Sequence, residues 1–146
     1  MIEWILLAVG LGLVAANAIF VAAEFSLVTV DRATVERRAA AGDRGAAGVL
    51  AALRTLSTQL SGAQLGITVT SLVLGFIMQP SLASLIDGPL AAAGLGAGAT
   101  GVSVILALAF ATGFQMVFGE LVPKNLAIAR PLPVARAVAP AQRGFT

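Results

Sequence analysis

Residues 4–23 read WILLAVGLGLVAANAIFVAA, and Asn17 is the only strongly polar side chain among these twenty residues. At about 1.5 Å of rise per residue, a helix of this length crosses the ~30 Å hydrocarbon core of a bilayer. Trp4 stands where an interfacial aromatic anchor belongs. The stretch therefore predicts a first membrane span, from about Trp4 to Val30 within residues 1–30.

The composition of the whole chain favours the same environment. Its 146 residues are 58% hydrophobic and 11% charged, whereas an ordinary soluble domain is about 25% charged. A soluble domain of this size buries only about 68–70% of its surface, which leaves no place for so many apolar side chains. Cysteine and histidine are both absent from the sequence. Thiolate and imidazole metal sites are thereby excluded, and any bound metal ion must be a hard cation with oxygen ligands, such as sodium, magnesium or calcium.

Two further apolar segments predict two more spans. The second runs from about residue 61 to residue 79 and can continue through residues 61–86, and the third covers about residues 101–119 within 100–122. Between them, the Asp-Gly-Pro triplet and the Ala/Gly-rich stretch of residues 87–98 predict a loop. We therefore expect an all-α integral membrane domain with three transmembrane helices.

The positive charges predict how these spans are oriented. All nine lie in two segments: Arg32, Arg37, Arg38, Arg44 and Arg54 after the first span, and Lys124, Arg130, Arg136 and Arg143 after the third. Three spans place the two segments on one side of the membrane, and the positive-inside rule makes that side cytoplasmic. We expect a multi-pass protein of the cell membrane with its N-terminus outside and its C-terminus in the cytoplasm.

Residues 31–60 form a connector that is too polar to span the membrane. Val49, Leu50, Leu53 and Leu56 recur at helical spacing, and the run Gly42-Asp43-Arg44-Gly45 predicts a break. We expect two juxtamembrane helices that lie along the cytoplasmic surface. Two interpretations stay open: a basic connector that touches lipid, or a helix that transmits a signal from a cytoplasmic domain.

Two carboxylates fall inside the predicted spans, Glu24 and Glu120. An ionisable group in the bilayer costs about 2.5–3.5 kcal/mol on insertion scales, so each is a candidate functional residue. For Glu24 the alternative is a pair with a nearby arginine, or extension to the interface. Asn17 lies seven residues earlier on the same helix face, so the two side chains can line one polar track.

The sequence around Glu120 adds a backbone oxygen to this carboxylate. In the run Gly119-Glu-Leu-Val-Pro-Lys124, Pro123 has no amide hydrogen and cannot bond back to the carbonyl of Gly119. A free carbonyl at membrane depth is tolerated only where it lines a cavity or binds something. A carbonyl beside a carboxylate is the beginning of a hard-cation site. The alternative is an ordinary proline kink whose carbonyl bonds a neighbouring hydroxyl.

The second span carries a polar stripe of small residues at helical spacing, with Thr70 one position off it. The stripe consists of Ser57, Ser61, Gln64, Thr68, Ser71 and Gly75. Such stripes serve either helix packing or the lining of a site. We expect the Glu120 carboxylate, the Gly119 carbonyl and Ser71 to meet around an ion. Thr68, Thr70 and Glu24 should then lie nearby.

Three motifs resemble those of a known family. They are NAIFVAAEFSLV at residues 17–28, LSGAQLGIT at residues 60–68 and GELVPKNLA at residues 119–127. Together they resemble the CNNM/CorC transmembrane domain, the membrane part of magnesium and cobalt efflux proteins that are often labelled hemolysin-like. The Gly-Glu-x-x-Pro-Lys element, which includes Pro123 and Lys124 as structural residues, is the most specific of the three.

The resemblance implies a homodimeric magnesium efflux transporter that is driven by sodium entry, with Glu120 as the glutamate of the third helix. It also implies a fourth membrane-associated helix, a pair of CBS domains and a CorC-type domain beyond Thr146. The alternative is a membrane scaffold or regulatory module that does not transport. No nucleophile–base pair, zinc spacing or phosphate loop indicates an enzyme, and the basic residues do not form a nucleic-acid groove. Small residues for close helix contact in the dimer are Gly12, Gly62, Gly66, Gly101 and Gly113.

The sequence departs from the family's ligand pattern at four positions. In the first helix, the stretch that carries a serine in the family has Val21 and Ala23 here and no hydroxyl. In the second helix, Ser71 stands in place of an asparagine, and Gly75 replaces a later serine. Magnesium requires six oxygens at about 2.0–2.1 Å and gives up water reluctantly. We therefore expect a partly hydrated or weaker magnesium site, or a preference for sodium.

Overall fold

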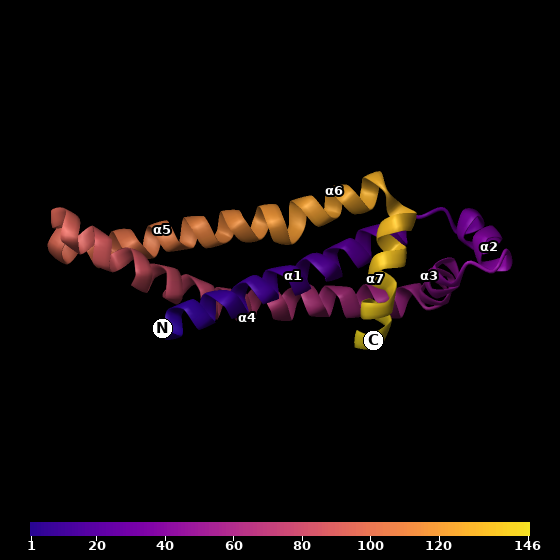
Figure 1. The fold of residues 1–146 in the computed structure, drawn as a ribbon, viewed down its shortest axis with the longest axis horizontal. Helices are drawn as coiled ribbons and strands as arrows, with labels where there is room; N and C mark the ends of the chain where they lie inside the picture. Colours follow the sequence, from indigo (N-terminus) through magenta and orange to yellow (C-terminus); the bar gives the residue numbers. More distant parts are fainter.

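A computed structural model describes the backbone of residues 1–146 and every side chain except those of Leu95 and Ala97. Three long helices lie side by side (Figure 1). The first is α1 (Ile2–Thr29), and the second is α4 (Leu56–Leu90). The third begins as α5 (Ala99–Phe114) and continues through the π-helical segment η3 (Gln115–Leu121) into α6 (Val122–Ala129).

All three helices are long and apolar enough to span a membrane, over Ile2–Thr29, Leu56–Gly94 and Ala99–Ala129. Large apolar side chains cover their outer surfaces, and Phe76, for example, is 83% exposed. An exposed apolar surface of this extent is expected where lipid rather than water surrounds the protein. The predicted all-α domain with three transmembrane helices is confirmed.

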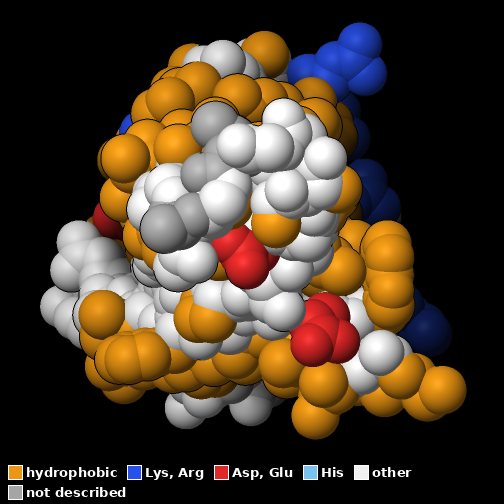
Figure 2. Space-filling view, turned by 90° about the vertical axis from the view of Figure 1, so that its left-hand side faces the viewer, with side chains coloured by type: hydrophobic (Ala, Val, Ile, Leu, Met, Phe, Trp, Pro, Cys, Tyr) orange, Lys and Arg blue, Asp and Glu red, His pale blue; other side chains and the backbone are white. Residues whose placement is uncertain are grey.

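Three shorter helices gather at one end of the bundle: α2 (Arg32–Ala40), α3 (Arg44–Arg54) and α7 (Pro131–Phe145). With Lys124 and Arg130 they carry every lysine and arginine of the chain, and we call this end the basic end. Figure 2 looks onto the opposite end of the molecule. There, acidic groups lie among apolar and uncharged atoms, and lysine and arginine show only at the margins of the view. The charge segregation in the sequence is therefore also a segregation in space.

The connection between the second and third helices corrects the predicted loop. Residues 87–90 are helical, because α4 continues through Asp87, Gly88 and Pro89 to Leu90. The π-helical η1 (Ala91–Leu95) and the 3₁₀ turn η2 (Gly96–Gly98) follow. The chain reverses at Gly94 and Gly96, whose positive φ angles of 94° and 54° suit glycine.

The connector between α1 and α4 forms the two predicted helices. They are separated at Gly42, where φ is 94°, and the Asp43 carboxylate accepts a hydrogen bond from the Ala46 amide at the start of α3. At the start of α2, the Thr34 hydroxyl donates to Asp31 at 2.6 Å and holds the pKa of that carboxyl below its usual value. The predicted break is therefore confirmed.

The apolar face of α3 packs against protein rather than facing lipid alone. Val49 and Leu53 belong to one buried cluster with Leu27 of α1 and with Ala135 and Ala139 of α7. The sequence predicted no helix over residues 131–145, and therefore no helix that could cover the apolar face of α3. Because α7 covers it, the two helices of the connector and α7 form one packed unit at the basic end.

Polar contacts fix α7 in this position, where it crosses the ends of the long helices (Figure 1). The Arg136 guanidinium pairs with Asp43 at 3.0 Å, across the α3–α7 contact. Gly45 provides the room, because a Cβ there would lie 2.5 Å from Nε of Arg136. The buried Gln142 donates from Nε2 to the backbone carbonyl of Gln59 in α4 at 2.7 Å.

Candidate functional site

A fully buried asparagine in α1 lies at the centre of a polar cluster that connects all three spans. The Asn17 Nδ2 donates to the backbone carbonyl of Gly119 at 2.9 Å. The Asn17 Oδ1 accepts from the Thr70 hydroxyl at 2.8 Å and from the Ser71 hydroxyl at 3.3 Å. Because a carbonyl can only accept, the amide nitrogen must face Gly119. We call Asn17, Thr70, Ser71, Gln115 and Gly119 the amide cluster.

Gln115 is the member of the cluster that the sequence analysis missed. Its Nε2 donates to the Ser71 hydroxyl at 3.4 Å. Its Oε1 is buried and accepts no hydrogen bond from any described residue. A Cβ at position 119 would lie 2.9 Å from this oxygen, so a larger residue there would require the Gln115 side chain to shift. The available signal was a strongly polar residue one turn before Gly119, inside an apolar span.

The Gly119 carbonyl is not free, which corrects the prediction made from Pro123. The donor is the Asn17 amide rather than the neighbouring hydroxyl of the alternative interpretation. Gly119 lies in the π-helical segment Gln115–Leu121, which precedes α6, and Pro123 stands in the first turn of α6. A π-helical turn inserts an extra residue and often occurs at functional sites. The local backbone is therefore irregular, as expected, but its carbonyl has a protein partner.

The two predicted carboxylates lie in one hollow, which we call the carboxylate hollow. It has a volume of about 170 Å³ and is lined by Val21, Glu24, Phe25, Ile67, Glu120 and Lys124. Glu24 Oε1 accepts from Gln64 Nε2 at 3.3 Å. The Lys124 ammonium lies over the Phe25 ring, 4.8 Å from its centroid. Among the described residues, neither glutamate forms an ion pair with a lysine or arginine, so the arginine partner suggested for Glu24 is not found.

A second hollow lies on the other side of the amide cluster. Its volume is about 160 Å³. Its lining includes Ser71, Gly75, Gln79, Thr112 and Gln115. Ser71 and Gln115 belong both to this hollow and to the amide cluster. Since residue 120 directly follows residue 119, the carboxylate hollow adjoins the cluster from the side of the basic end. Polar groups therefore continue along the inside of the domain from one hollow to the other.

The predicted site residues thus separate into two neighbouring groups. Gly119, Thr70 and Ser71 meet at Asn17, which the sequence placed on a polar track with Glu24. Glu24 and Glu120 meet in the carboxylate hollow, with Lys124 beside them. Thr68 joins neither group, because its hydroxyl donates to the carbonyl of Gln64 in its own helix at 2.9 Å.

From Ser57 to Thr68, the polar stripe lies outside the buried face of α4. The buried face of the helix is a different row: Gln59, Ala63, Gly66, Thr70, Leu74, Met78 and Ser81. The stripe lies beside that row and is largely exposed from Ser57 to Thr68. Thr70, one position off the stripe, is buried and reaches Asn17 together with Ser71.

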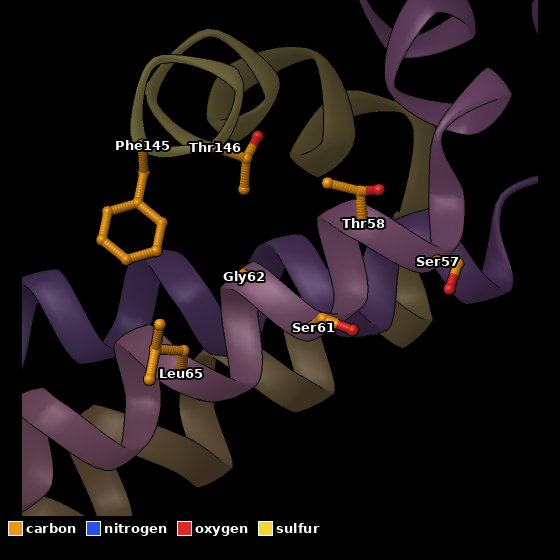
Figure 3. Close-up of a pocket in the computed structure, with 7 residues that line it drawn as sticks. All are labelled: Ser57, Thr58, Ser61, Gly62, Leu65, Phe145 and Thr146. Atoms are coloured by element: carbon orange, nitrogen blue, oxygen red, sulfur yellow. The ribbon is translucent and has the colours of Figure 1, made fainter.

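At the basic end, the stripe borders an open pocket of about 450 Å³ (Figure 3). Ser57, Thr58, Ser61, Gly62 and Leu65 of α4 line one side, and Phe145 and Thr146 line the other. The Thr146 hydroxyl donates to Gln59 Oε1 at 3.1 Å. The Phe145 ring contacts Phe20 of α1 edge to face, with centroids 4.7 Å apart. The pocket is therefore the space between the end of α7 and the polar stripe.

No group of three acidic side chains in the described part of the chain is close enough to hold a metal ion. The amides, hydroxyls and carbonyl of the amide cluster are neutral oxygen groups of the kind that a hard cation accepts. Spans of this kind, with a buried polar cluster and two carboxylates at membrane depth, define a multi-pass helical membrane domain with a polar interior.

Comparison with known proteins identifies the family. Residues 8–146 match the family model described as the cyclin M transmembrane N-terminal domain, CNNM. The chain belongs to this family, and the resemblance that its three motifs indicated is confirmed.

Relatives of this chain occur in several bacteria. It is 47% identical over 137 residues to the UPF0053 protein MT1890 of Mycobacterium tuberculosis (strain CDC 1551 / Oshkosh). These residues cover 93% of this chain and 30% of that protein. It is 35% identical over 117 residues to the UPF0053 protein YhdT of Bacillus subtilis (strain 168), covering 80% of this chain and 25% of that protein. The UPF0053 protein sll0260 of Synechocystis is 34% identical over 134 residues, 88% of this chain and 29% of that protein. The chain thus spans less than a third of the length of these relatives.

Proposed function

We propose that this chain is the membrane domain of a divalent-cation efflux transporter, with magnesium as the cargo and sodium entry as the driving force. The observation that carries the proposal is the buried Gln115 Oε1, which has no donor among the described residues. Buried oxygens are normally hydrogen-bonded, so one without a donor calls for an explanation. It lies beside Gly119, next in sequence to the Glu120 carboxylate. A hard cation supplies the missing partner for oxygens of this kind.

The Asn17 side chain can present either its amide nitrogen, a hydrogen-bond donor, or its amide oxygen, a cation ligand, to the Gly119 carbonyl. With its amide nitrogen on the Gly119 carbonyl, Asn17 offers no oxygen to a cation beside that carbonyl. Turning the amide by about 180° brings Oδ1 to that carbonyl, where two oxygens repel each other unless a cation lies between them. The Thr70 and Ser71 hydroxyls then accept from the amide nitrogen, because a hydroxyl both donates and accepts. Ion binding and the Asn17–Gly119 hydrogen bond therefore exclude each other.

The ligand set favours a cation that keeps part of its water. Glu120 supplies negative charge, whereas Val21, Ala23 and Gly75 supply no side-chain oxygen. Magnesium needs six oxygens in near-octahedral geometry and usually retains several waters when the protein offers few ligands. The hollows on both sides of the amide cluster have room for such water. A partly hydrated magnesium ion, or sodium in its place, is the cargo that these residues suit.

The two hollows suggest a path with a barrier between them. The amide cluster closes the interior between the carboxylate hollow and the hollow lined by Gln79 and Thr112. We place the basic end in the cytoplasm of the cell and the N-terminus outside, because the positive-inside rule assigns all nine lysines and arginines to that side. The carboxylate hollow then faces the cytoplasm. Cations would enter there, attracted by Glu24 and Glu120.

A homodimer would cover the exposed polar stripe of α4. Polar side chains on the outside of a span are costly in lipid, and inter-helix contacts are their usual partners. Gly62 and Gly66 already serve contacts within the chain, with Thr146 and Phe20. Gly12, Gly101 and Gly113 have no described atom within 4 Å of an added Cβ, so they remain available for a second copy. In the full-length protein, CBS domains would follow α7 and act on the basic end.

The test is magnesium release from loaded vesicles that contain the full-length protein, under an inward sodium gradient. Glu120→Gln should abolish release, because it removes the negative charge nearest the amide cluster. The matched control is Glu36→Gln, an exposed glutamate of α2 that pairs only with Arg32. Equal release by wild type and Glu120→Gln would refute transport through this site. It would support the alternative, a scaffold or regulatory module, for which the tight docking of α7 on α3 is the favouring observation.

A further inference from the structure

An apolar groove runs along the outside of the domain between α1, the third span and α7. Its volume is about 510 Å³, and Ile19, Phe118, Leu126 and Val138 contribute to its walls. Arg130, at the basic end, is the one charged residue of the lining. We call this space the lateral groove. Two of its walls lie within the membrane-spanning segments Ile2–Thr29 and Ala99–Ala129, and α7 forms the third. Along the two spans the groove opens toward lipid rather than toward water.

A basic hollow adjoins the lateral groove. Its volume is about 380 Å³, and it is lined by Arg38 of α2 and by Leu132, Pro133 and Arg136 of α7. Pro133 lines both spaces, so they are neighbours. Arg136 is paired with Asp43 at 3.0 Å. In the described part of the chain, neither Arg38 nor Arg130 pairs with a carboxylate, so both guanidinium groups are available for an anion.

The length of the lateral groove suits one leaflet of a bilayer. From Phe118 to Arg130 the third span rises by roughly 18 Å at about 1.5 Å per residue. Half of a ~30 Å hydrocarbon core is about 15 Å. An acyl chain that begins near the midplane and ends at Arg130 therefore places its headgroup at the level of the basic hollow.

The backbone of α7 offers little to an anion, so the arginines must provide the binding. Pro131 and Pro133 have no amide hydrogen, and the Val134 amide already donates to the carbonyl of Arg130. The usual helix N-terminal contacts with phosphate are thus largely absent here. Guanidinium groups bind phosphate oxygens in a forked geometry, and basic pockets beside membrane helices recognise anionic headgroups.

We propose that the lateral groove and the basic hollow together bind one anionic glycerophospholipid, with an acyl chain in the groove and the phosphate between Arg130 and Arg38. The lipid would fill the space between the third span and α7 and tie α2 to α7 through its headgroup. This site lies outside the amide cluster and the carboxylate hollow. The proposal is therefore independent of the transported ion.

The experiment titrates the purified chain, freed of lipid in detergent, with phosphatidylglycerol or phosphatidylcholine, and counts bound lipids by native mass spectrometry. Wild type should bind phosphatidylglycerol at least tenfold more tightly than phosphatidylcholine. Arg38→Gln and Arg130→Gln should each weaken phosphatidylglycerol binding about fivefold, as expected for one basic residue near an anionic headgroup. Arg54→Gln, an exposed arginine outside both spaces, is the matched control and should bind as wild type does.

A groove variant and a soluble ligand separate the acyl and phosphate parts of the site. Ala137→Trp, at an exposed position of the groove wall, should weaken both lipids because it fills the groove. Thermal unfolding without lipid checks that each variant is folded. Equal binding of the two lipids, or arginine variants that bind like Arg54→Gln, would overturn the proposal. So would stabilisation by sn-glycerol 3-phosphate as large as that by phosphatidylglycerol, because the site would then recognise a soluble phosphate.

Discussion

The side-chain amide of Asn17 in the first span donates a hydrogen bond to the backbone carbonyl of Gly119 in the third, at 2.9 Å. These residues are 102 positions apart in the sequence, and both are buried. The bond occupies a backbone oxygen of the irregular turn in the third span. The stability of the bundle and the proposed binding of a cation therefore depend on the same contact.

Asn17→Leu should destabilise the folded domain by about 1–3 kcal/mol. The substitution leaves the Gly119 carbonyl without its donor, and a buried polar group without a partner costs about this much. Thermal unfolding in detergent measures the change. The control is Asn125→Leu, since Asn125 is exposed on α6. If the two variants melt at the same temperature, the Asn17–Gly119 hydrogen bond does not stabilise the bundle.

The candidate ligands can be ranked by the stabilisation that magnesium or sodium gives to the domain. Glu120→Ala should abolish ion-dependent thermal stabilisation, because it removes the charge, and Ser71→Ala should only weaken it. Thr68→Ala should leave it unchanged, because the Thr68 hydroxyl bonds within its own helix. Ion binding by Glu120→Ala equal to that of wild type would contradict the site assignment.

Restoring neutral ligands should strengthen magnesium binding. Val21 lines the carboxylate hollow and Ser71 belongs to the amide cluster. Val21→Ser adds a hydroxyl oxygen to the hollow, and Ser71→Asn replaces a hydroxyl with an amide oxygen on a longer side chain. Calorimetry should show tighter magnesium binding than in wild type. The same double change in a Glu120→Gln background is the control, and it should bind no better than that single variant.

Gly66→Ala should destabilise the contact between α1 and α4. An added Cβ would lie 2.6 Å from the ring of Phe20, and overpacking of this kind typically costs about 1–3 kcal/mol. Gly75→Ala in the same helix is the matched control, since no described atom lies within 4 Å of its added Cβ. It should be neutral or slightly stabilising because alanine favours helix. Phe20→Leu should rescue Gly66→Ala by removing the ring.

The proposed orientation can be tested by single cysteines, since the chain contains none. In intact cells, a membrane-impermeant thiol reagent should modify Ala92→Cys, in the connection between α4 and α5. It should not modify Arg44→Cys, at the start of α3, until the membrane is opened. Labelling of Arg44→Cys from outside would reverse the assignment of the basic end to the cytoplasm.

The sequence predicted the features that depend on local composition. The three spans follow from apolar length, and the break between α2 and α3 follows from Gly42, whose φ is positive as a glycine turn requires. The loop at residues 87–98 was placed too early, because Gly88 and Pro89 are held within a long helix whose apolar surface continues on both sides of them. Local turn signals do not take account of the apolar surface that favours continuing the helix.

The candidate site was predicted only in part, because it depends on how the helices are rotated relative to one another. The sequence singled out Asn17, Ser71 and Gly119, yet it could not show that Asn17 faces both of the others. A row of polar residues gives no indication of which neighbouring row is buried, so Thr68 was grouped with Ser71 although it faces away from the amide cluster. Gln115 was missed because its partner Ser71 lies on another helix.

The π-helical segment Gln115–Leu121 holds the residues after it one position out of α-helical register. One residue of an α-helix corresponds to about 100° of rotation, since a turn contains 3.6 residues. If the segment tightened to α-helical hydrogen bonding, everything from Glu120 to the end of α6 would turn by that angle about the helix axis while the residues before Gln115 stayed in place. Glu120 and Lys124 would swing out of the carboxylate hollow together. The one extra residue in this segment thus sets how the part of the third span after it is rotated relative to the part before it. It thereby decides the direction in which Glu120 and Lys124 point their charges.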